Sequence, residues 1–284
     1  MRYRKYKDGV EIFDFDSFDI KQILECGQCF RFSGANNNYF IIAHRKKLNI
    51  QQDNNKIFFS PCNVDDFENI WINYFDLETN YLEIKKILSQ KDNILAEAIK
   101  FGSGIRILNQ EKFECLISFI ISQNNNIPRI KNIIEKISIE LGDQISENYF
   151  AFPSMSQLKN ADKNKLLGCR MGFRLNYILD ALNKINSNFD LEALKTQKTE
   201  VIKKKLMAIK GVGDKVSDCV LLFSYNRHEI FPIDIWIKKV MQKIYFPDQE
   251  INIKQIHDFA KNKFGDLAGY AQQYLFYYFR GKKF

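Results

Sequence analysis

The sequence is poor in proline, histidine and tryptophan, and no apolar run in it is long enough to cross a membrane. Its 284 residues include only 5 prolines, 3 histidines and 2 tryptophans. Runs such as CLISFIIS, at residues 115–122, are far shorter than the roughly 18 residues of a membrane span. The N-terminal stretch MRYRKYKDGVEIF lacks the apolar core of a signal peptide. We therefore expect a cytoplasmic protein with no membrane contact.

Cysteine is present but too scattered to form a disulfide framework in a chain of this length. The sequence contains Cys26, Cys29, Cys62, Cys115, Cys169 and Cys219. The first two form a C-x-x-C pattern, yet no second cysteine or histidine pair follows at ligand spacing. We expect free thiols in a reducing compartment, and neither a metal site nor another cofactor.

What the sequence does contain is enough apolar material for one or two cores and an excess of positive charge. Hydrophobic residues make up 45% and aromatic residues 14% of the chain, and the formal net charge is +8 with a pI near 9.0. A basic surface favours a polyanionic partner. The preference is modest, because a chain rich in Lys, Asn and Ile also reflects genome composition.

The hydrophobic pattern predicts an α+β protein with two parts. The first hundred residues show short alternating segments separated by turn residues, which predicts an antiparallel sheet from VEIFDF, QCFRFSG, NYFIIAHR, KLNIQQ and KIFFSP. Helices are expected near Val64–Leu77 and Leu82–Ala98. Beyond that point a 3.6-residue period prevails, as in the stripe from Ile130 to Leu141 that Pro128 opens and Gly142 closes. We predict a sheet domain at 1–105 and a helical domain at 106–284, packed against each other.

The stretch GVGDKVSDC is the most informative part of the helical half. An amphipathic helix should end near Ile209, a Gly-Val-Gly turn should follow, and a second helix should begin near Asp214. Such a helix-hairpin-helix lets the backbone at Gly211 and Gly213 come close to a partner, and its free amides suit a DNA phosphate. An ordinary glycine-terminated helix hairpin fits the three residues GVG equally well.

Lys215 lies in the first turn of that second helix, which is an unfavourable position for a positive charge. The helix dipole and desolvation both favour its neutral form, and a neutral lysine is a nucleophile. Downstream, Asp234 is a candidate N-cap of a helix that begins at Ile235. A helix to about Tyr225 carries the chain roughly 15 Å away. The next eight residues reach up to about 26 Å, so the carboxylate can return to the amine. Capping alone would also explain Asp234.

These residues resemble the helix-hairpin-helix DNA glycosylases, and within them the 8-oxoguanine DNA glycosylase/AP lyase family. The main motif is KGVGDKVSDCVLLFSYNRHEIFPIDIWIKK, in which Lys215 and Asp234 match the family's Schiff-base lysine and its aspartate at a separation of nineteen residues. The segments CGQCFRF, SQNNNIPRI, MGFRLNY and AGYAQQYLF match further family motifs in the family's order. The resemblance spans residues 26 to 276 and implies a TBP-like sheet domain followed by an all-α glycosylase domain.

The resemblance also implies roles for the residues of these motifs. In the base pocket, Phe276 and Cys219 would sandwich the extruded base, Gln272 would bond its Watson–Crick edge, Pro232 would line the pocket and Gly27 would offer a carbonyl to the hydrogen on ring nitrogen 7. Guanine carries a lone pair at that nitrogen, so the carbonyl would discriminate against it.

At the DNA, the resemblance implies that Asn124, Arg129 and Arg174 hold the cytosine left without its partner and that Phe173 wedges into the stack. The sequence departs from some members at two positions. The wedge is Phe173 where others have tyrosine, which preserves stacking. Trp236 stands where others have a histidine that contacts a phosphate, and this puts that contact in doubt.

The implied function is excision of 8-oxoguanine opposite cytosine from double-stranded DNA, followed by β-elimination through a Lys215 Schiff base, in a monomer that needs no cofactor. One alternative is a helix-hairpin-helix glycosylase for another lesion. The iron–sulfur type of such enzymes carries four cysteines near its C-terminus, whereas here no cysteine follows Cys219. The other alternative is a non-catalytic DNA-binding module, against which the pair of Lys215 and Asp234 argues.

Overall fold

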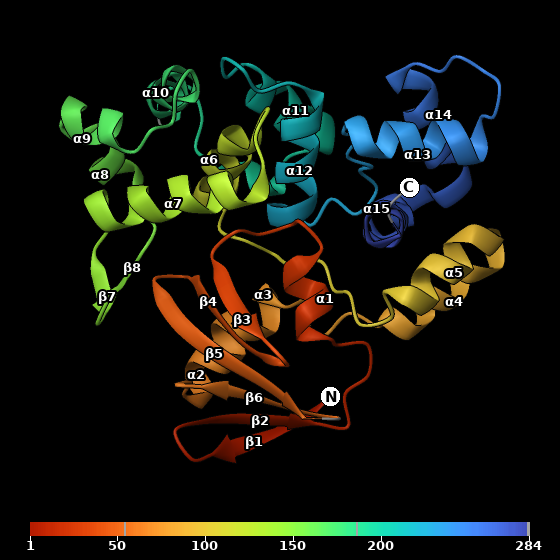
Figure 1. Cartoon of the computed structure of the whole chain (residues 1–284), viewed down its shortest axis with the longest axis horizontal. Coiled ribbons are helices and arrows are strands. Elements are labelled where there is room, and N and C mark those ends of the chain that lie inside the picture. Colours follow the sequence, from red (N-terminus) through yellow and green to blue (C-terminus); the bar gives the residue numbers. More distant parts are fainter. Residues whose placement is uncertain (54, 186, 283–284) are drawn as a thin grey trace.

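A computed structural model of the chain describes residues 1–53, 55–185 and 187–282 and has the predicted α+β architecture. A twisted sheet forms one part and a group of helices the other (Figure 1). All strand pairs of the sheet are antiparallel, in the order β1-β2-β6-β5-β4-β3. Its strands are β1 (Arg2–Tyr6), β2 (Gly9–Phe13), β3 (Phe32–Ala35), β4 (Asn38–Ala43), β5 (Lys46–Asp53) and β6 (Lys56–Ser60).

Two elements of this part were not predicted. Strand β1 has no buried residue and pairs along its whole length with β2 at the edge of the sheet, so it shows no apolar pattern. Helix α1 (Ile20–Glu25) is a short helix that begins where the Asp19 carboxylate accepts from the Gln22 amide at 2.9 Å. Residues 28–31, predicted as strand, are loop, because the chain turns there from α1 into β3.

The helices that follow the sheet are α2 (Val64–Asp66), η1 (Phe67–Trp71), α3 (Ile72–Tyr74), α4 (Tyr81–Lys91) and α5 (Asn93–Phe101). The single helix predicted at 82–98 is wrong, since the chain is extended at Asp92 and the side chain of Asp92 caps α5 by accepting from Leu95 N at 2.7 Å. Both α4 and α5 contribute apolar residues to the core of the helical half. The domain boundary at residue 105 stays a prediction.

The second half is mainly helical over residues 106–185 and 187–282, where it also contains a short hairpin that was not predicted. The hairpin joins β7 (Gln144–Ser146) to β8 (Tyr149–Phe150). The remaining elements are α6 (Lys112–Ser122), α7 (Ile127–Leu141), α8 (Met155–Lys159), α9 (Lys163–Gly168), α10 (Arg174–Lys184), η2 (Ala193–Thr196), α11 (Thr199–Met207), α12 (Asp214–Ser224), α13 (Ile235–Tyr245), α14 (Ile253–Phe264), η3 (Gly265–Leu267) and α15 (Ala268–Gly281). Helices α11 and α12 and the turn between them form the predicted helix-hairpin-helix.

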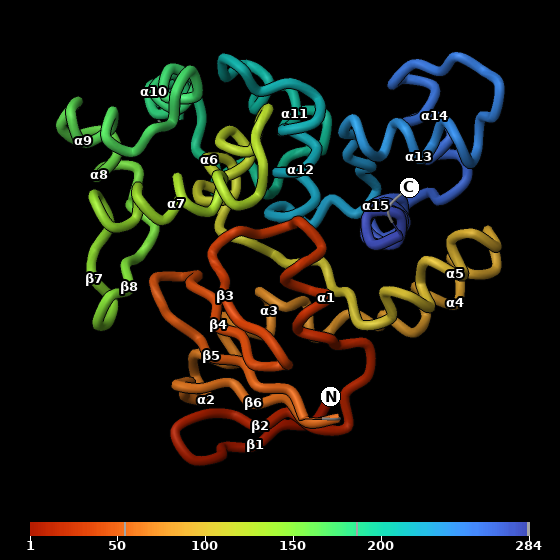
Figure 2. The backbone as a smooth tube through the Cα atoms, in the orientation of Figure 1, coloured from red at the N-terminus to blue at the C-terminus, as the bar shows by residue number. Residues whose placement is uncertain are grey.

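Two apolar cores meet at residues 102–111, the linker between α5 and α6. One lies under the sheet and includes Phe59, Trp71 and Phe75, and the other is built from the helices. The fully buried Arg106 guanidinium donates to the carbonyls of Phe75, Ser17, Asp76 and Thr79 and so fixes the linker. Figure 2 shows the linker passing between the sheet and the helical group.

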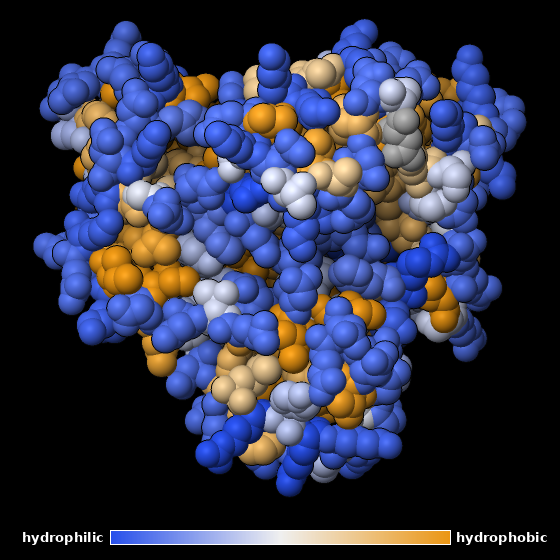
Figure 3. Space-filling model, turned by 180° about the vertical axis from the view of Figure 1, so that it is seen from behind, coloured by the Kyte–Doolittle hydropathy of each residue, from blue (hydrophilic) through white to orange (hydrophobic). Residues whose placement is uncertain are grey.

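The face of the molecule in Figure 3 is largely hydrophilic. The face in Figure 3 carries separate apolar patches among polar side chains. Within residues 1–53, 55–185 and 187–282, no helix has the length and apolar character to span a membrane.

Candidate active site

The amine of Lys215, carried by α12, lies against helix α6. Lys215 is the second residue of α12, so its side chain starts where the hairpin turn ends. Its Nζ donates to Ser122 Oγ at 3.3 Å and lies 4.9 Å from the centroid of the Phe119 ring. Ser122 and Phe119 both belong to the last turns of α6, so this helix positions the amine.

Asp234 approaches from the start of α13. As predicted, it is the N-cap: its Oδ1 accepts from Ile237 N at 2.7 Å. The chain leaves α12 at Ser224, returns through an extended segment and begins α13 beside the starting end of α12. Lys215 and Asp234 consequently line one cavity. Two helix N-termini at this place also favour a bound anion.

That cavity is small, and it collects every base-pocket residue named from the sequence. Its volume is about 50 Å³, and its lining comprises Cys26, Gly27, Phe119, Lys215, Cys219, Phe223, Pro232, Asp234, Gln272, Gln273 and Phe276. Since a water molecule occupies about 30 Å³ of liquid, the cavity has room for one or two waters. A purine therefore enters only if side chains at the mouth move.

Gln272 brings an unsatisfied acceptor to this cavity. The side chain is 6% exposed, and its Oε1 is buried with no hydrogen-bond partner among the described residues. Leaving a buried acceptor without a donor costs about 1–3 kcal/mol, so a folded protein rarely keeps one without a reason. The donors on the Watson–Crick edge of a guanine-type base would satisfy it.

The turn at Gly27 is held rigidly on both sides. Gly27 has a φ of +86°, which disfavours other residues. The carbonyl before it, of Cys26, accepts from Gln273 Nε2 at 2.8 Å, and the carbonyl after it, of Gln28, accepts from Gln110 Nε2 at 2.7 Å. These two bonds fix the direction of the peptide groups around Gly27. They make the turn a preorganised edge of the cavity.

Cys219 and Phe276 enter the cavity from α12 and α15. Burial raises the pKa of the Cys219 thiol to about 11, although the neighbouring Lys215 lowers it. The side chain is therefore a neutral thiol, suited to packing on a base. Phe276 remains partly exposed at the mouth, where the Arg280 guanidinium lies 5.8 Å from its ring centroid.

Three of the predicted DNA contacts, Asn124, Arg129 and Phe173, are exposed outside the cavity. Asn124, with a φ of 46°, is exposed in the turn between α6 and α7. Arg129 is exposed in the first turn of α7, and its backbone N–H donates to the N-cap Asn126 at 3.0 Å. Phe173 is the N-cap of α10, and it is 49% exposed. These side chains are available to a ligand outside the protein core.

Arg174, unlike the other side chains predicted to contact DNA, is buried. It is only 2% exposed, and its guanidinium donates to the carbonyls of Gln123 and Asn124. In this structure it supports the turn that carries Asn124. Its contact with a cytosine stays a prediction.

The two hairpin glycines differ in what surrounds them. Gly211 has a φ of +78°, and a Cβ at this position would overlap the ring of Tyr177. Gly213 is the N-cap of α12 and offers no side chain to the first amides of the helix, which leaves them open to a phosphate oxygen. A Cβ at Gly213 would meet nothing within 4 Å.

The sequence did not point to Phe119, Ser122 or Gln273. The first two lie in the segment CLISFIIS, which is buried from Cys115 to Ile121 and so shows no polar stripe that would mark an exposed face. Gln273 neighbours Gln272 in the motif AGYAQQYLF, and a second amide directly after a pocket amide was the available signal. The six cysteines are buried free thiols, and the described residues contain no cluster that could hold a metal ion.

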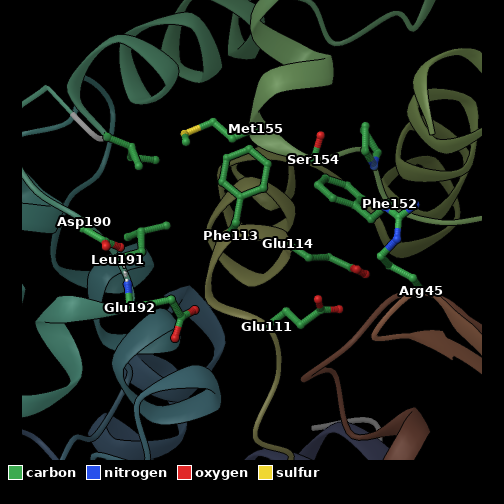
Figure 4. Close-up of a pocket in the computed structure, with 12 residues that line it drawn as sticks. Arg45, Glu111, Phe113, Glu114, Phe152, Ser154, Met155, Asp190, Leu191 and Glu192 are labelled. Atoms are coloured by element: carbon green, nitrogen blue, oxygen red, sulfur yellow. Dashed lines mark hydrogen bonds between the residues drawn. The ribbon is translucent and has the colours of Figure 1, made fainter. Parts of the chain in front are cut away.

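A larger cavity of about 400 Å³ lies at the other end of α6 (Figure 4). Glu111 and Glu114 line one side of it and Asp190 and Glu192 the other, with the Phe113 ring between the two sets. It contains none of the residues predicted to act on DNA. Its size alone therefore does not make it the reaction site.

The chain matches two described families in succession. Residues 12–116 match the 8-oxoguanine DNA glycosylase, N-terminal domain, and residues 117–264 match the HhH-GPD superfamily base excision DNA repair protein.

Similar proteins include a solved structure and two curated proteins. The structure is the Clostridium acetobutylicum 8-oxoguanine glycosylase/lyase in complex with double-stranded DNA containing cytosine opposite 8-oxoG; it is 39% identical, with a TM-score of 0.95 over 100% of this chain and 99% of that one. The probable N-glycosylase/DNA lyase of Methanothermobacter thermautotrophicus is 29% identical over 71% of each chain. The N-glycosylase/DNA lyase of Saccharomyces cerevisiae is 27% identical over 95% of this chain and 86% of its own length.

Proposed function

The chain belongs to the HhH-GPD superfamily of base excision DNA repair proteins, and from this premise we propose that it is a bifunctional DNA glycosylase and AP lyase that removes 8-oxoguanine paired with cytosine. The carrying observation is the single cavity that Lys215, Asp234 and the unpartnered Oε1 of Gln272 share. An amine, a carboxylate and a free acceptor in one small cavity suit base release from a sugar carbon.

The proposed first step is substitution at C1′ of the flipped nucleotide. The Nζ of Lys215, as the neutral amine, forms a bond to C1′ while the bond from C1′ to N9 of the base breaks, and the base leaves with a proton. Positive charge develops on the sugar during this exchange. The Asp234 carboxylate, held by its bond to Ile237 N, stabilises that charge without having to move.

The second step breaks the strand. The ring oxygen leaves C1′, which gives a Schiff base between Lys215 and the opened sugar. Loss of a proton from C2′ then expels the 3′ phosphate by β-elimination. Hydrolysis of the imine returns the free amine, so all atoms balance with water as the only co-reactant.

Lesion recognition is proposed to come from the two fixed polar edges of the cavity. The carbonyl of Gly27 accepts from the hydrogen on ring nitrogen 7 of 8-oxoguanine, and Gln272 accepts from the Watson–Crick edge. Gln273 and Gln110 bond the carbonyls on either side of Gly27, and these bonds oppose a rotation of the turn that would relieve the repulsion of a guanine lone pair.

The same proposal covers the surroundings of the reaction. Double-stranded DNA is the partner, gripped by the hairpin amides and by the exposed Asn124, Arg129 and Phe173. A monomer in the cytoplasm fits a protein with six free, buried thiols, since such thiols persist in a reducing compartment. Size-exclusion chromatography with light scattering tests the monomer.

The test uses duplexes that carry 8-oxoguanine opposite each of the four bases, with the products resolved by denaturing electrophoresis. We expect base loss and a strand nick, fastest with cytosine opposite the lesion. Excision of an alkylated base or thymine glycol without excision of 8-oxoguanine would assign the chain to another lesion. Binding without any product would leave a non-catalytic DNA-binding protein.

A further inference from the structure

Helix α10 links three segments that are proposed to meet DNA, namely the wedge Phe173, the turn at Asn124 and the hairpin before α12. Phe173, the proposed wedge, precedes its first residue. The next residue, Arg174, holds the turn at Gln123 and Asn124. The following two turns of α10 reach the hairpin between α11 and α12. The reaction steps proposed above do not involve these contacts between α10 and the hairpin.

The first contact is between a ring and a glycine. The ring of Tyr177 lies against Gly211 so closely that no side chain fits there, and the φ of +78° at Gly211 independently disfavours any other residue. A glycine without Cβ lets a whole ring face pack on the hairpin backbone. The same ring lies 5.6 Å from the ring of Phe173, edge to face at 74°. Tyr177 therefore touches both the wedge and the hairpin.

The second contact is made by a carboxylate. Asp180 Oδ2 accepts from the backbone N–H of Lys210 at 2.6 Å, one residue before the hairpin glycine. It also accepts from Lys184 Nζ at 2.9 Å, and Lys184 in turn donates to the carbonyl of Ala208. Although partial burial opposes it, bonding to Lys210 and Lys184 lowers the pKa of Asp180. The charged form is thus the one that binds the hairpin.

We propose that Tyr177 and Asp180 are positioning residues that hold the wedge Phe173 in fixed register with the hairpin, so that gripping the phosphates places the wedge at one base step. The inference rests on the proposed function, because it assigns both segments to DNA. Unstacking a base step costs a few kcal/mol, and only an inserted, well-placed wedge repays it. A displacement of about 1 Å in such an arrangement can cost about 100-fold in rate.

The experiment compares Tyr177→Ala with Tyr177→Phe in single-turnover excision from a duplex with 8-oxoguanine opposite cytosine. Alanine removes the ring from both Phe173 and Gly211, and we expect a 10- to 100-fold loss of rate. Phenylalanine keeps the ring, and we expect a rate within about twofold of wild type. Equal rates for all three proteins would overturn the proposal.

Two further measurements separate positioning from a general loss of structure. Borohydride trapping on an abasic site in single-stranded DNA needs no wedge, so Tyr177→Ala should trap there as wild type does. Fluorescence of 2-aminopurine beside the lesion reports unstacking, and at saturating protein its rise should be lost with Tyr177→Ala. Equal losses on single-stranded and duplex substrates, or an unchanged fluorescence rise, would refute the proposal.

A double mutant tests the link to the wedge itself. If Tyr177 acts through Phe173, the double mutant Tyr177→Ala/Phe173→Ala should excise less than threefold more slowly than the single mutant Phe173→Ala. Independent roles would instead multiply the two losses and contradict the proposal.

Asp180 provides a second route should Tyr177→Ala unfold. Asp180→Ala removes the acceptor of Lys210 N and should slow duplex excision about tenfold while sparing single-stranded trapping. Asp180→Asn keeps an acceptor and should lose less. An Asp180→Ala protein that excises at the wild-type rate would refute the role of Asp180. Wild-type protein that excises nothing would refute the proposed function instead, so the two failures are distinguishable.

Discussion

The two ends of helix α6 border cavities of opposite character. At its last turns, Phe119 and Ser122 hold the amine of Lys215 beside a cavity of about 50 Å³. At its beginning, Glu111 and Glu114 line a cavity of about 400 Å³. The helix spans 11 residues and is about 16 Å long.

The kinds of functional groups that line a cavity, and not its volume, distinguish the reactive site. The small cavity combines a nucleophile, a carboxylate and an unpartnered acceptor, whereas the large one has carboxylates facing each other across an apolar surface. The small cavity also has room for only one or two waters, and electrostatic interactions are stronger where little water is present. Changes at the two ends of α6 should therefore have different consequences.

The largest expected effect is at the amine. Lys215→Gln keeps a polar side chain of similar length but cannot form a Schiff base, so borohydride trapping of the protein on DNA should disappear. The measurement is a gel that resolves the covalent adduct, with wild type as the reference. Trapping that persists in the variant would transfer the nucleophile to another residue.

Next in size is the carboxylate. Asp234→Asn retains a good N-cap, so α13 should stay intact while the charge that faces the developing cation is lost. We expect excision to fall by about 100- to 1,000-fold with DNA affinity unchanged. Single-turnover kinetics and a binding titration measure the two quantities. If Asp234→Asn excises the base at the wild-type rate, then Asp234 serves only as a helix cap.

A smaller and more selective effect is expected at the turn. In Gly27→Ala the new methyl group would lie 3.0 Å from Phe276 Cε1 at a φ of +86°, so the turn and the ring must both shift. We expect excision of 8-oxoguanine to fall at least tenfold, while cleavage of a preformed abasic site, which brings no base, continues. Parallel assays on the two substrates decide. Equal losses on both would show a general defect.

The acidic end of α6 should respond in stability and not in activity. Burial raises the pKa of Glu114 to about 7, despite Arg31 nearby, so its contribution to stability is present at low pH and is lost as the pH rises towards 7. Wild type should lose about 1–3 kcal/mol of unfolding free energy relative to Glu114→Gln between pH 5 and pH 8. Urea unfolding at the two pH values measures this.

The excision rate of Glu114→Gln should equal that of wild type. A variant that slows the reaction would break the contrast between the two ends of the helix. Identical pH dependence in both proteins would place the titrating group elsewhere.

Much of the site follows from local sequence patterns. The glycine turn before Lys215 and the N-cap character of Asp234 are properties of a few neighbouring residues, and the structure has both. Strands β5 and β6 alternate between buried and less buried residues and so carry a period-2 pattern that can be recognised, whereas β2 is buried over four consecutive residues and is recognised by its apolar composition between turns. Family motifs added the base-pocket residues, and all of these line one cavity.

What escaped prediction depends on contacts between distant segments. Gln273 matters because it bonds the carbonyl of Cys26, and although the paired amides of its segment draw attention to it, they do not identify this distant partner. Phe119 and Ser122 sit on a helix that is buried on all sides, where periodicity is lost. Arg174 could be assigned to DNA from its motif, but its burial under the turn at Gln123 appears only in the folded chain.

The bond between Gln273 and the Cys26 carbonyl has a consequence for how the protein acquires activity during synthesis. The two residues are 247 positions apart, so no native base pocket exists until nearly all of the described chain has left the ribosome. Tyr278 likewise bonds Glu97 of α5 across 181 positions. Contacts this far apart form late and slowly. Local helices and the sheet can form on the emerging chain, whereas competence for catalysis arises in a final closure around α15.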